Sequence, residues 1–201
     1  MKRSVNILLA TLAFAVPAAL EGQAGSPAGA VPVAQLTARR QALIGKLKSG
    51  VALIRGASEL SDDPPDSQYP QASSFRQDND FFYFTGLETH DSWLLVVATD
   101  SLHGEAHLFL PPRNPQQERW TGPTVGPGPE AAAATGIPAG NIHSADSVEP
   151  IVRRLLGQGG RTGGSTLWVR HTERDTRPEF VSRAVLGGRN LTSRDLLPVL
   201  A

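Results

Sequence analysis

The feature that most constrains the fold is a run of four consecutive aromatic residues, Phe-Phe-Tyr-Phe, at residues 81–84. A charged, polar stretch, Arg-Gln-Asp-Asn-Asp, comes directly before the run, and Gly86 follows it where the backbone can turn away. Apolar residues without polar alternation are typical of a strand that is buried on both faces of a sheet. We therefore predict a buried strand at residues 81–84, with the preceding charged side chains hydrogen-bonded at its start.

The segments around this run alternate between predicted strands and predicted helices. Further strands are predicted at residues 51–54, 92–99, 105–110 and 166–169. Helices are predicted at residues 35–49, 129–135 and 176–186, and another follows residues 144–146 and runs through Leu156. Residues 100–104 fit a hairpin, so Phe81, Trp93 and Leu108 are predicted to lie in three strands of a meander. Alternation of strand and helix in the second half favours crossover connections. The pattern predicts a single α/β domain, a mixed sheet flanked by helices.

Composition excludes several classes of function. The chain has 19 basic and 19 acidic side chains, and the resulting zero net charge gives no electrostatic case for nucleic acid or an anionic membrane. The absence of cysteine excludes disulfides, thiolate metal sites and cysteine nucleophiles. A hydrophobic content of 40% is typical of a globular domain.

The N-terminus has the parts of a secretory signal peptide. Lys2 and Arg3 precede a mostly apolar segment at residues 5–16, and Gly22 and Ala24 supply small residues for cleavage. The apolar segment is shorter than the about 20 residues that cross a membrane, and an uncleaved anchor is the alternative. We expect a signal peptide at residues 1–24, a linker at 25–34 and a domain at 35–201. The mature domain should be periplasmic or extracellular, without membrane contact after cleavage.

Residues 75–86 carry a resemblance to a known family. Their pattern, Phe-Arg-Gln-x-Asn-Asp-Phe-x-Tyr-Phe-Thr-Gly, resembles the motif of the N-terminal domain of aminopeptidase P, the Xaa-Pro aminopeptidases. The motif positions are Arg76, Gln77, Asn79, Asp80, Tyr83 and Gly86. The resemblance extends from about residue 39 to about residue 192, through Leu-Phe-Leu-Pro at residues 108–111 and Glu-Arg-Trp-Thr-Gly at residues 118–122. It implies a three-layer fold similar in outline to ribonuclease H. The related prolidase N-terminal domain is an alternative that these motifs favour less.

The resemblance also implies that the catalytic residues belong to a different domain of the enzyme. In this family, the metal ligands and catalytic residues lie in a second, C-terminal domain, where two metal ions, usually manganese, activate water for release of an N-terminal residue preceding proline. We expect this chain to wall the substrate cleft and to build the oligomer interface. Its implied partners are a catalytic peptidase domain, neighbouring subunits and the peptide substrate. The alternative is a non-catalytic binding domain from a truncated or split gene.

Two side chains are implied as accessory substrate contacts. In oligomers of related aminopeptidases, the tryptophan of the Trp-x-Gly region reaches toward the active site of a neighbouring subunit, which is Trp120 in this sequence. The alternative is that Trp120 covers the edge of its own sheet. Arg189 resembles a second arginine that faces the active site, and Arg194 competes for that position.

Other candidate metal sites and acid–base sites are weaker. His103 and His107 are four residues apart, a spacing that can share one face of a strand, but we expect ordinary turn and strand residues. Asp62, Asp63 and Asp66 form the densest acidic cluster and could hold a divalent ion. Two prolines interrupt that cluster, so we expect a solvated turn.

No catalytic motif replaces these candidates. Arg76, Asp78 and Asp80 could support acid–base chemistry because charged neighbours shift pKa values, but we expect a structural hydrogen-bond network. Residues 157–166, GQGGRTGGST, lack the lysine and the strand–loop–helix order of a phosphate loop. The sequence contains neither His-Glu-x-x-His nor Gly-x-Ser-x-Gly.

Overall fold

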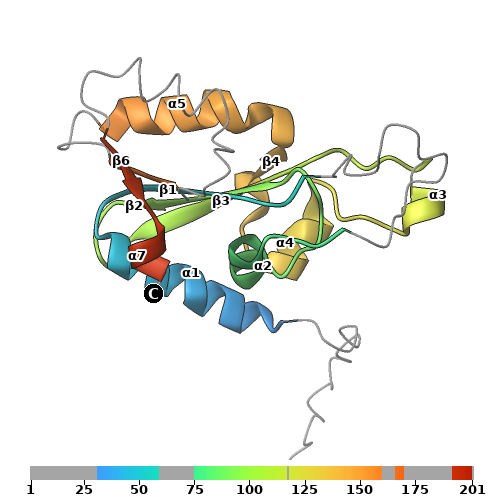
Figure 1. Cartoon of the computed structure of the whole chain (residues 1–201), viewed down its shortest axis with the longest axis horizontal. Coiled ribbons are helices and arrows are strands. Elements are labelled where there is room, and N and C mark those ends of the chain that lie inside the picture. The colour runs from blue at the N-terminus through green and yellow to red at the C-terminus, as the bar shows by residue number, and fades with distance from the viewer. Residues whose placement is uncertain (1–30, 59–74, 117, 160–165, 170–191, 201) are drawn as a thin grey trace, which may run out of the picture. The chain divides into compact units, whose positions relative to one another are not determined.

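The computed structural model describes residues 31–58, 75–116, 118–159, 166–169 and 192–200 (Figure 1). The predicted signal peptide, the acidic loop with Asp62, Asp63 and Asp66, the helix at residues 176–186 and Arg189 lie outside the described residues. Among the described helices, none combines the length and apolar character needed to cross a membrane.

The described strands form one mixed sheet. They are β1 (Gly50–Arg55), β2 (Trp93–Ala98), β3 (Gly104–Leu110), β4 (Ile142–Ser144), β5 (Thr166–Val169) and β6 (Thr192–Asp195). Their order across the sheet is β4-β3-β2-β1-β5-β6. The neighbours β1, β2 and β3 are antiparallel, whereas β4 joins β3, β5 joins β1 and β6 joins β5 in parallel. The predicted mixed sheet is therefore confirmed, and its meander consists of β1, β2 and β3.

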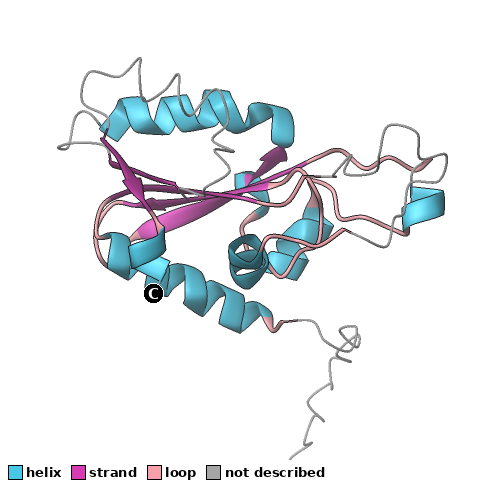
Figure 2. Ribbon diagram, viewed as in Figure 1, coloured by secondary structure: helices cyan, strands magenta, loops and turns pink. Residues whose placement is uncertain are grey.

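Helices cover both faces of the sheet. The described helices are α1 (Val33–Leu47), α2 (Asn79–Thr85), α3 (Glu118–Thr121), α4 (Pro129–Thr135), α5 (Val148–Gly159) and α7 (Leu197–Leu200), with short 3-10 turns η2 (Ala139–Asn141) and η3 (Ala145–Ser147). Figure 2 shows α1, α2, α4 and α7 on one face and α5 on the other. The order of layers is helix, sheet, helix, as the α/β prediction required.

Each face of the sheet has its own apolar core. Along β1, Ala52 and Ile54 pack with α1, α2 and α4, whereas Val51 and Leu53 pack under α5. Successive side chains of a strand point to opposite faces, so a strand covered on both sides needs a continuous apolar run. This requirement explains why residues 51–54 lack polar alternation.

The aromatic run is a helix, so the strand predicted at residues 81–84 is wrong. The Asp78 carboxylate accepts hydrogen bonds from the backbone nitrogens of Asp80 and Phe81, at 2.9 and 3.0 Å, and caps the first turn of α2. Phe81 and Phe84 are buried three residues apart, while the Tyr83 ring between them is 50% exposed. Four adjacent aromatics are compatible with a buried strand or a short helix, and the Asp78 cap together with the left-handed Gly86 favours the helix.

Helices α2 and α4 end in the same way. Each closes with a Thr-Gly pair, Thr85-Gly86 and Thr135-Gly136, whose threonine hydroxyl donates a 2.7 Å hydrogen bond to the carbonyl four residues earlier. Gly86 and Gly136 adopt φ values of 68° and 70°, in the left-handed region that glycine enters without strain. The chain therefore leaves both helices in the same local geometry.

Arg40 of α1 joins these two helix ends. It lies on the buried face of this helix with Leu36, Leu43, Ile44 and Leu47, as the helical spacing of these five residues in the sequence predicts. Its guanidinium donates to the carbonyl oxygens of Phe84, at 2.8 Å, and Thr135, at 2.6 Å. Burial leaves Arg40 5% exposed and lowers its pKa to about 10. A cation at two helix C-termini complements both helix dipoles.

Several short elements escaped prediction. Strands β4 and β6, the single turn α3 and the terminal turn α7 each span three or four residues. The helix predicted to follow residues 144–146 begins at Val148, after β4 ends at Ser144 and η3 intervenes, and it continues to Gly159, past its predicted end at Leu156. Strands this short contain too few residues for a period-2 pattern to be visible.

Candidate functional site

The candidate site lies on the loop between β3 and α4, residues 111–128, which we call the α3 loop. Figure 1 shows α3 standing away from the sheet at the end of this loop. The turn begins where the Glu118 backbone nitrogen donates to the Asn114 carbonyl at 2.9 Å, and closes where the Gly122 nitrogen donates to the Glu118 carbonyl at 3.1 Å. Trp120 is the third residue of α3, and its side chain lies outside the described part of the structure.

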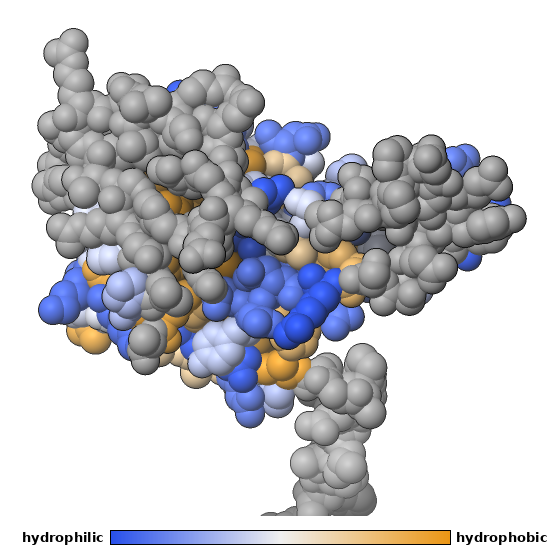
Figure 3. Space-filling view, viewed as in Figure 1, coloured by the Kyte–Doolittle hydropathy of each residue, from blue (hydrophilic) through white to orange (hydrophobic). Residues whose placement is uncertain are grey.

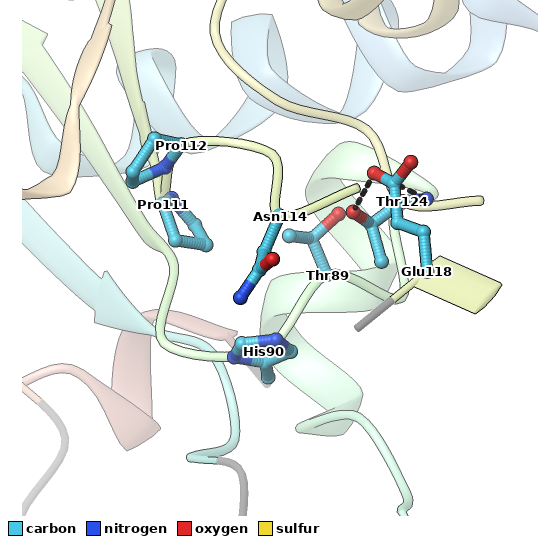
Figure 4. A pocket seen from close by; sticks show the side chains of 7 residues that line it. All are labelled: Thr89, His90, Pro111, Pro112, Asn114, Glu118 and Thr124. Carbon is cyan, nitrogen blue, oxygen red and sulfur yellow. Dashed lines mark hydrogen bonds between the residues drawn. The ribbon is translucent and has the colours of Figure 1, made fainter. Parts of the chain in front are cut away.

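Glu118 connects the two sides of the α3 loop. Its Oε1 and Oε2 accept from Nε and Nη2 of Arg113 at 2.8 and 2.6 Å, a bidentate ion pair. The Thr124 hydroxyl donates to the same Oε1 at 2.8 Å (Figure 4). The Glu118 side chain is 11% exposed and that of Arg113 is 49% exposed. We call these three residues the Glu118 brace.

Hydrogen bonds keep the brace ionised over a wide pH range. The bonds from Arg113, and then that from Thr124, lower the pKa of Glu118 to about 2. The same interaction with Glu118 raises the pKa of Arg113 above its ordinary value. Both partners therefore stay charged at neutral pH and in moderate acid.

A small pocket opens beside the brace. Figure 4 shows the side chains that line it: Thr89, His90, Pro111, Pro112, Asn114, Glu118 and Thr124. Its volume is about 30 Å³, which is enough to hold a water molecule.

The motif residues around α2 make structural hydrogen bonds. Gln77 accepts from the Ala57 backbone nitrogen at 2.6 Å and donates to the Thr89 carbonyl at 2.8 Å, so it ties the end of β1 to the segment before β2. Arg76 donates to the Asn79 side chain at 3.3 Å. The predicted network thus exists at the start of a helix, where a strand was expected.

Other motif positions lie around α2. Asp80 is in its first turn, and Gly86 caps its end. The guanidinium carbon of Arg39 lies 4.2 Å from the ring centre of Tyr83, and Arg39 also donates to the Tyr83 carbonyl at 2.8 Å. This arginine on an aromatic face is a cation–π contact at the surface.

His103 and His107 do not share a site. His103 lies in the exposed hairpin, where its Nδ1 is 2.8 Å from Asp100. His107 is buried on β3, and its Nδ1 lies 3.1 Å from Nε2 of His143 on β4. Nε2 of His107 lies 3.2 Å from Oε1 of Glu105, close enough for an ion pair but without hydrogen-bond geometry.

The environment of His143 disfavours its charged form. Burial is the main cause of its lowered pKa, followed by the proximity of His107 and Arg154. The ring also packs against Phe109, with centroids 5.1 Å apart. Sequence reasoning missed the His107–His143 pair because strand β4, which brings His143 beside β3, was not predicted.

The described residues do not fit the metal centre that the family implies. Among them, no group of three or more histidine, aspartate or glutamate side chains could hold a metal ion. His107 and His143 direct their facing nitrogens at each other. The described candidate residues can position the chain and contact a ligand, but they offer no ligand set for metal-assisted hydrolysis.

Comparison with known proteins gives a consistent result. The family model described as "Aminopeptidase P, N-terminal domain" matches residues 36–173. The Xaa-Pro aminopeptidase of Escherichia coli K12 is 37% identical over 89 residues, which are 44% of this chain and 19% of that protein. Xaa-Pro aminopeptidase 3 of Dictyostelium discoideum is 34% identical over 93 residues, which are 46% of this chain and 17% of that protein.

Solved structures share the fold. A variant of Escherichia coli aminopeptidase P has a TM-score of 0.68 at 25% identity. The zinc-substituted enzyme in complex with product has a TM-score of 0.67 at 26% identity. Both matches cover 85% of this chain and 38% of the solved chain.

The chain therefore spans about a fifth of the length of the curated relatives that it matches. The family model, in contrast, covers more than half of the chain, and the observed α/β architecture is that of the matching structures. On these grounds the chain belongs to the family of aminopeptidase P N-terminal domains.

Proposed function

We propose that this chain is the N-terminal domain of an Xaa-Pro metalloaminopeptidase, which acts with a catalytic domain to release an N-terminal residue that precedes proline. The observation that carries the proposal is the family match over residues 36–173. The relatives with the same domain are Xaa-Pro aminopeptidases from bacteria, an amoeba and mammals.

In this proposal the catalytic domain binds two divalent metal ions, with manganese as the proposed metal. The N-terminal domain walls the substrate cleft and contributes to the oligomer interface. Trp120 is the proposed accessory substrate contact in a neighbouring subunit, which is supported by the position of α3 away from the sheet (Figure 1). Arg189 is the second proposed contact. Its competitor Arg194 lies on β6, opposite Trp168 of β5.

Export is part of the same proposal. Residues 1–24 act as a signal peptide, and the mature domain works in the periplasm or outside the cell. N-terminal sequencing of the mature protein tests this directly. A new N-terminus near residue 25 is expected, whereas retention of Met1 in the exported fraction would contradict cleavage.

A stand-alone binding domain is the second candidate function. The observation that favours it is the surface around Tyr83, a half-exposed ring stacked under Arg39. Aromatic and arginine side chains are enriched at protein interfaces. Figure 3 shows hydrophilic residues gathered in the middle of the visible face, with hydrophobic residues around them. This candidate predicts no hydrolysis in any native complex of the chain.

One experiment separates the two functions. The native protein is captured from its source cells with an antibody raised against residues 31–201, and the precipitate is assayed for hydrolysis of an Xaa-Pro peptide with added manganese. We expect chelator-sensitive activity, which disappears when excess recombinant chain competes for the antibody. A precipitate that contains the chain but hydrolyses no peptide would leave the binding-domain function in its place.

A further inference from the structure

The position of α3 needs an explanation, because one helical turn is not stable on its own. Nucleating a first turn fixes several backbone dihedrals in return for a single hydrogen bond, so a four-residue helix is unstable without other support. Figure 1 shows α3 away from the sheet and the other helices. Among the described residues, the support that the structure shows for α3 lies within the α3 loop itself.

The Glu118 brace supplies this support from both directions. Arg113 precedes α3 and Thr124 follows it, and both donate to the same carboxylate at 2.6–2.8 Å. The Thr124 backbone nitrogen adds a longer contact of 3.4 Å to Oε1. One side chain in the first turn of α3 thereby fixes the chain on each side of that turn.

Arg113 is itself held in place. Gly126 is buried, and a Cβ atom added there would meet Cγ of Arg113 at 2.7 Å, so the arginine stem packs directly on the glycine backbone. Nη1 of Arg113 lies 4.0 Å from the carboxylate of Glu130 at the start of α4. The brace is thus anchored to the segment that leads into the helix layer.

We propose that Glu118 is a positioning residue, which together with Arg113 and Thr124 fixes the orientation of α3 and with it the backbone of Trp120. The inference rests on the proposed function, in which Trp120 contacts substrate from a fixed position. The claim that the Glu118 carboxylate holds α3 in place concerns this chain alone, so it can be tested without a catalytic domain.

The test requires a carboxylate-specific change. Glu118→Gln keeps the shape of the side chain but replaces one carboxylate oxygen with an NH₂ group. This group cannot accept a hydrogen bond, so one of the two bonds from Arg113 is lost. Glu130→Gln is the matched control, because Glu130 also lies near Arg113 but is exposed and at 4.0 Å. Arg113→Lys is the conservative variant, which keeps the positive charge but loses the bidentate geometry.

The measurement is the ¹⁵N order parameter of the backbone amides of Arg119, Trp120 and Gly122 in the full 201-residue chain. In the wild type and in Glu130→Gln we expect rigid values, about 0.8. In Glu118→Gln we expect values below about 0.6, with the amides of β2 and β3 unchanged, and in Arg113→Lys an intermediate loss. In the wild type these values stay constant from pH 8 to pH 4.

Two results would overturn the proposal. Rigid α3 amides in a folded Glu118→Gln protein would show that the brace does not hold the turn. A loss of order spread over β2 and β3 as well would show that Glu118 only supports the fold. Neither result depends on catalysis, so failure of the antibody-capture assay would reject the proposed function and leave the brace intact.

Discussion

A single buried guanidinium, that of Arg40, connects three helices of this domain. Its two short bonds to the carbonyls of Phe84 and Thr135 satisfy backbone oxygens at the ends of α2 and α4. The spacing of residues along α1 placed Arg40 on the buried face correctly. Its partners could not be predicted, because they are backbone carbonyls whose position depends on the fold and not on the identity of a side chain.

Arg40→Met should destabilise the domain by about 2–6 kcal/mol, because two buried carbonyl groups lose their donor at about 1–3 kcal/mol each. Urea unfolding at neutral pH measures the free energy of unfolding. The neighbouring Arg39→Met is the control, since Arg39 donates to one exposed carbonyl, and its cost should be below about 1 kcal/mol. Equal losses in the two variants would contradict the role assigned to Arg40.

His143 should make the stability of the domain sensitive to pH. The pKa of His143 in the folded state lies below the ordinary value of 6.5, because of burial and of the nearby His107 and Arg154. The acidic side chain next to His107 is Glu105. Above pH 6.5 the imidazole is neutral in both folded and unfolded chains, so stability is complete. Below pH 6.5 the unfolded chain takes up the proton first, and stability falls until the folded group is also protonated.

Urea unfolding midpoints at pH 8 and pH 5 test this expectation. The midpoint of the wild type should fall over this range by more than that of His143→Gln, which keeps a polar side chain but does not titrate. The same decrease in both proteins would mean that other groups cause the pH dependence.

Among the helices and strands, α2 shows most clearly what the sequence alone could decide. The aromatic run correctly indicated a buried element, and Gly86 correctly marked its end. Its type was predicted wrongly, because burial of Phe81 and Phe84 is compatible with either periodicity over so few residues. The Asp78 cap and the left-handed Gly86 favour the helix from both ends. Strands β4 and β6 were missed because their pairing depends on distant partners.

Asp78→Ala should cost about 1 kcal/mol, because two backbone nitrogens at the start of α2 lose their acceptor. Asp78→Asn is the matched control, since asparagine caps helices nearly as well and should retain most of the stability. Thermal unfolding followed by circular dichroism gives the comparison. If alanine and asparagine were equally tolerated, the cap would not be what selects the helix.

The candidate site was also only partly predictable. The Glu-Arg-Trp-Thr-Gly pattern located the segment that the structure shows as α3 and Gly122. The brace could not be predicted, because no motif relates Glu118 to Arg113 and Thr124, and their pairing follows from the course of the α3 loop. The pair of His107 and His143 was hidden for a similar reason, since it forms only when β4 pairs with β3.

At the scale of the whole domain, the proposed function gives this chain a supporting role and assigns the catalytic metal ions to another domain. The sheet and its two helix layers present the α3 loop at one side, and the described residues contain no ligand set for a metal ion.

The central claim is tested by assaying the purified recombinant chain for hydrolysis of an Xaa-Pro peptide with manganese, beside calorimetric titration of the metal. We expect no turnover and no tight metal binding. Turnover that survives purification and disappears with a chelator would contradict it. Such activity would mean that side chains of this chain, among them His90, His103, His107 or its aspartates, bind the catalytic metal.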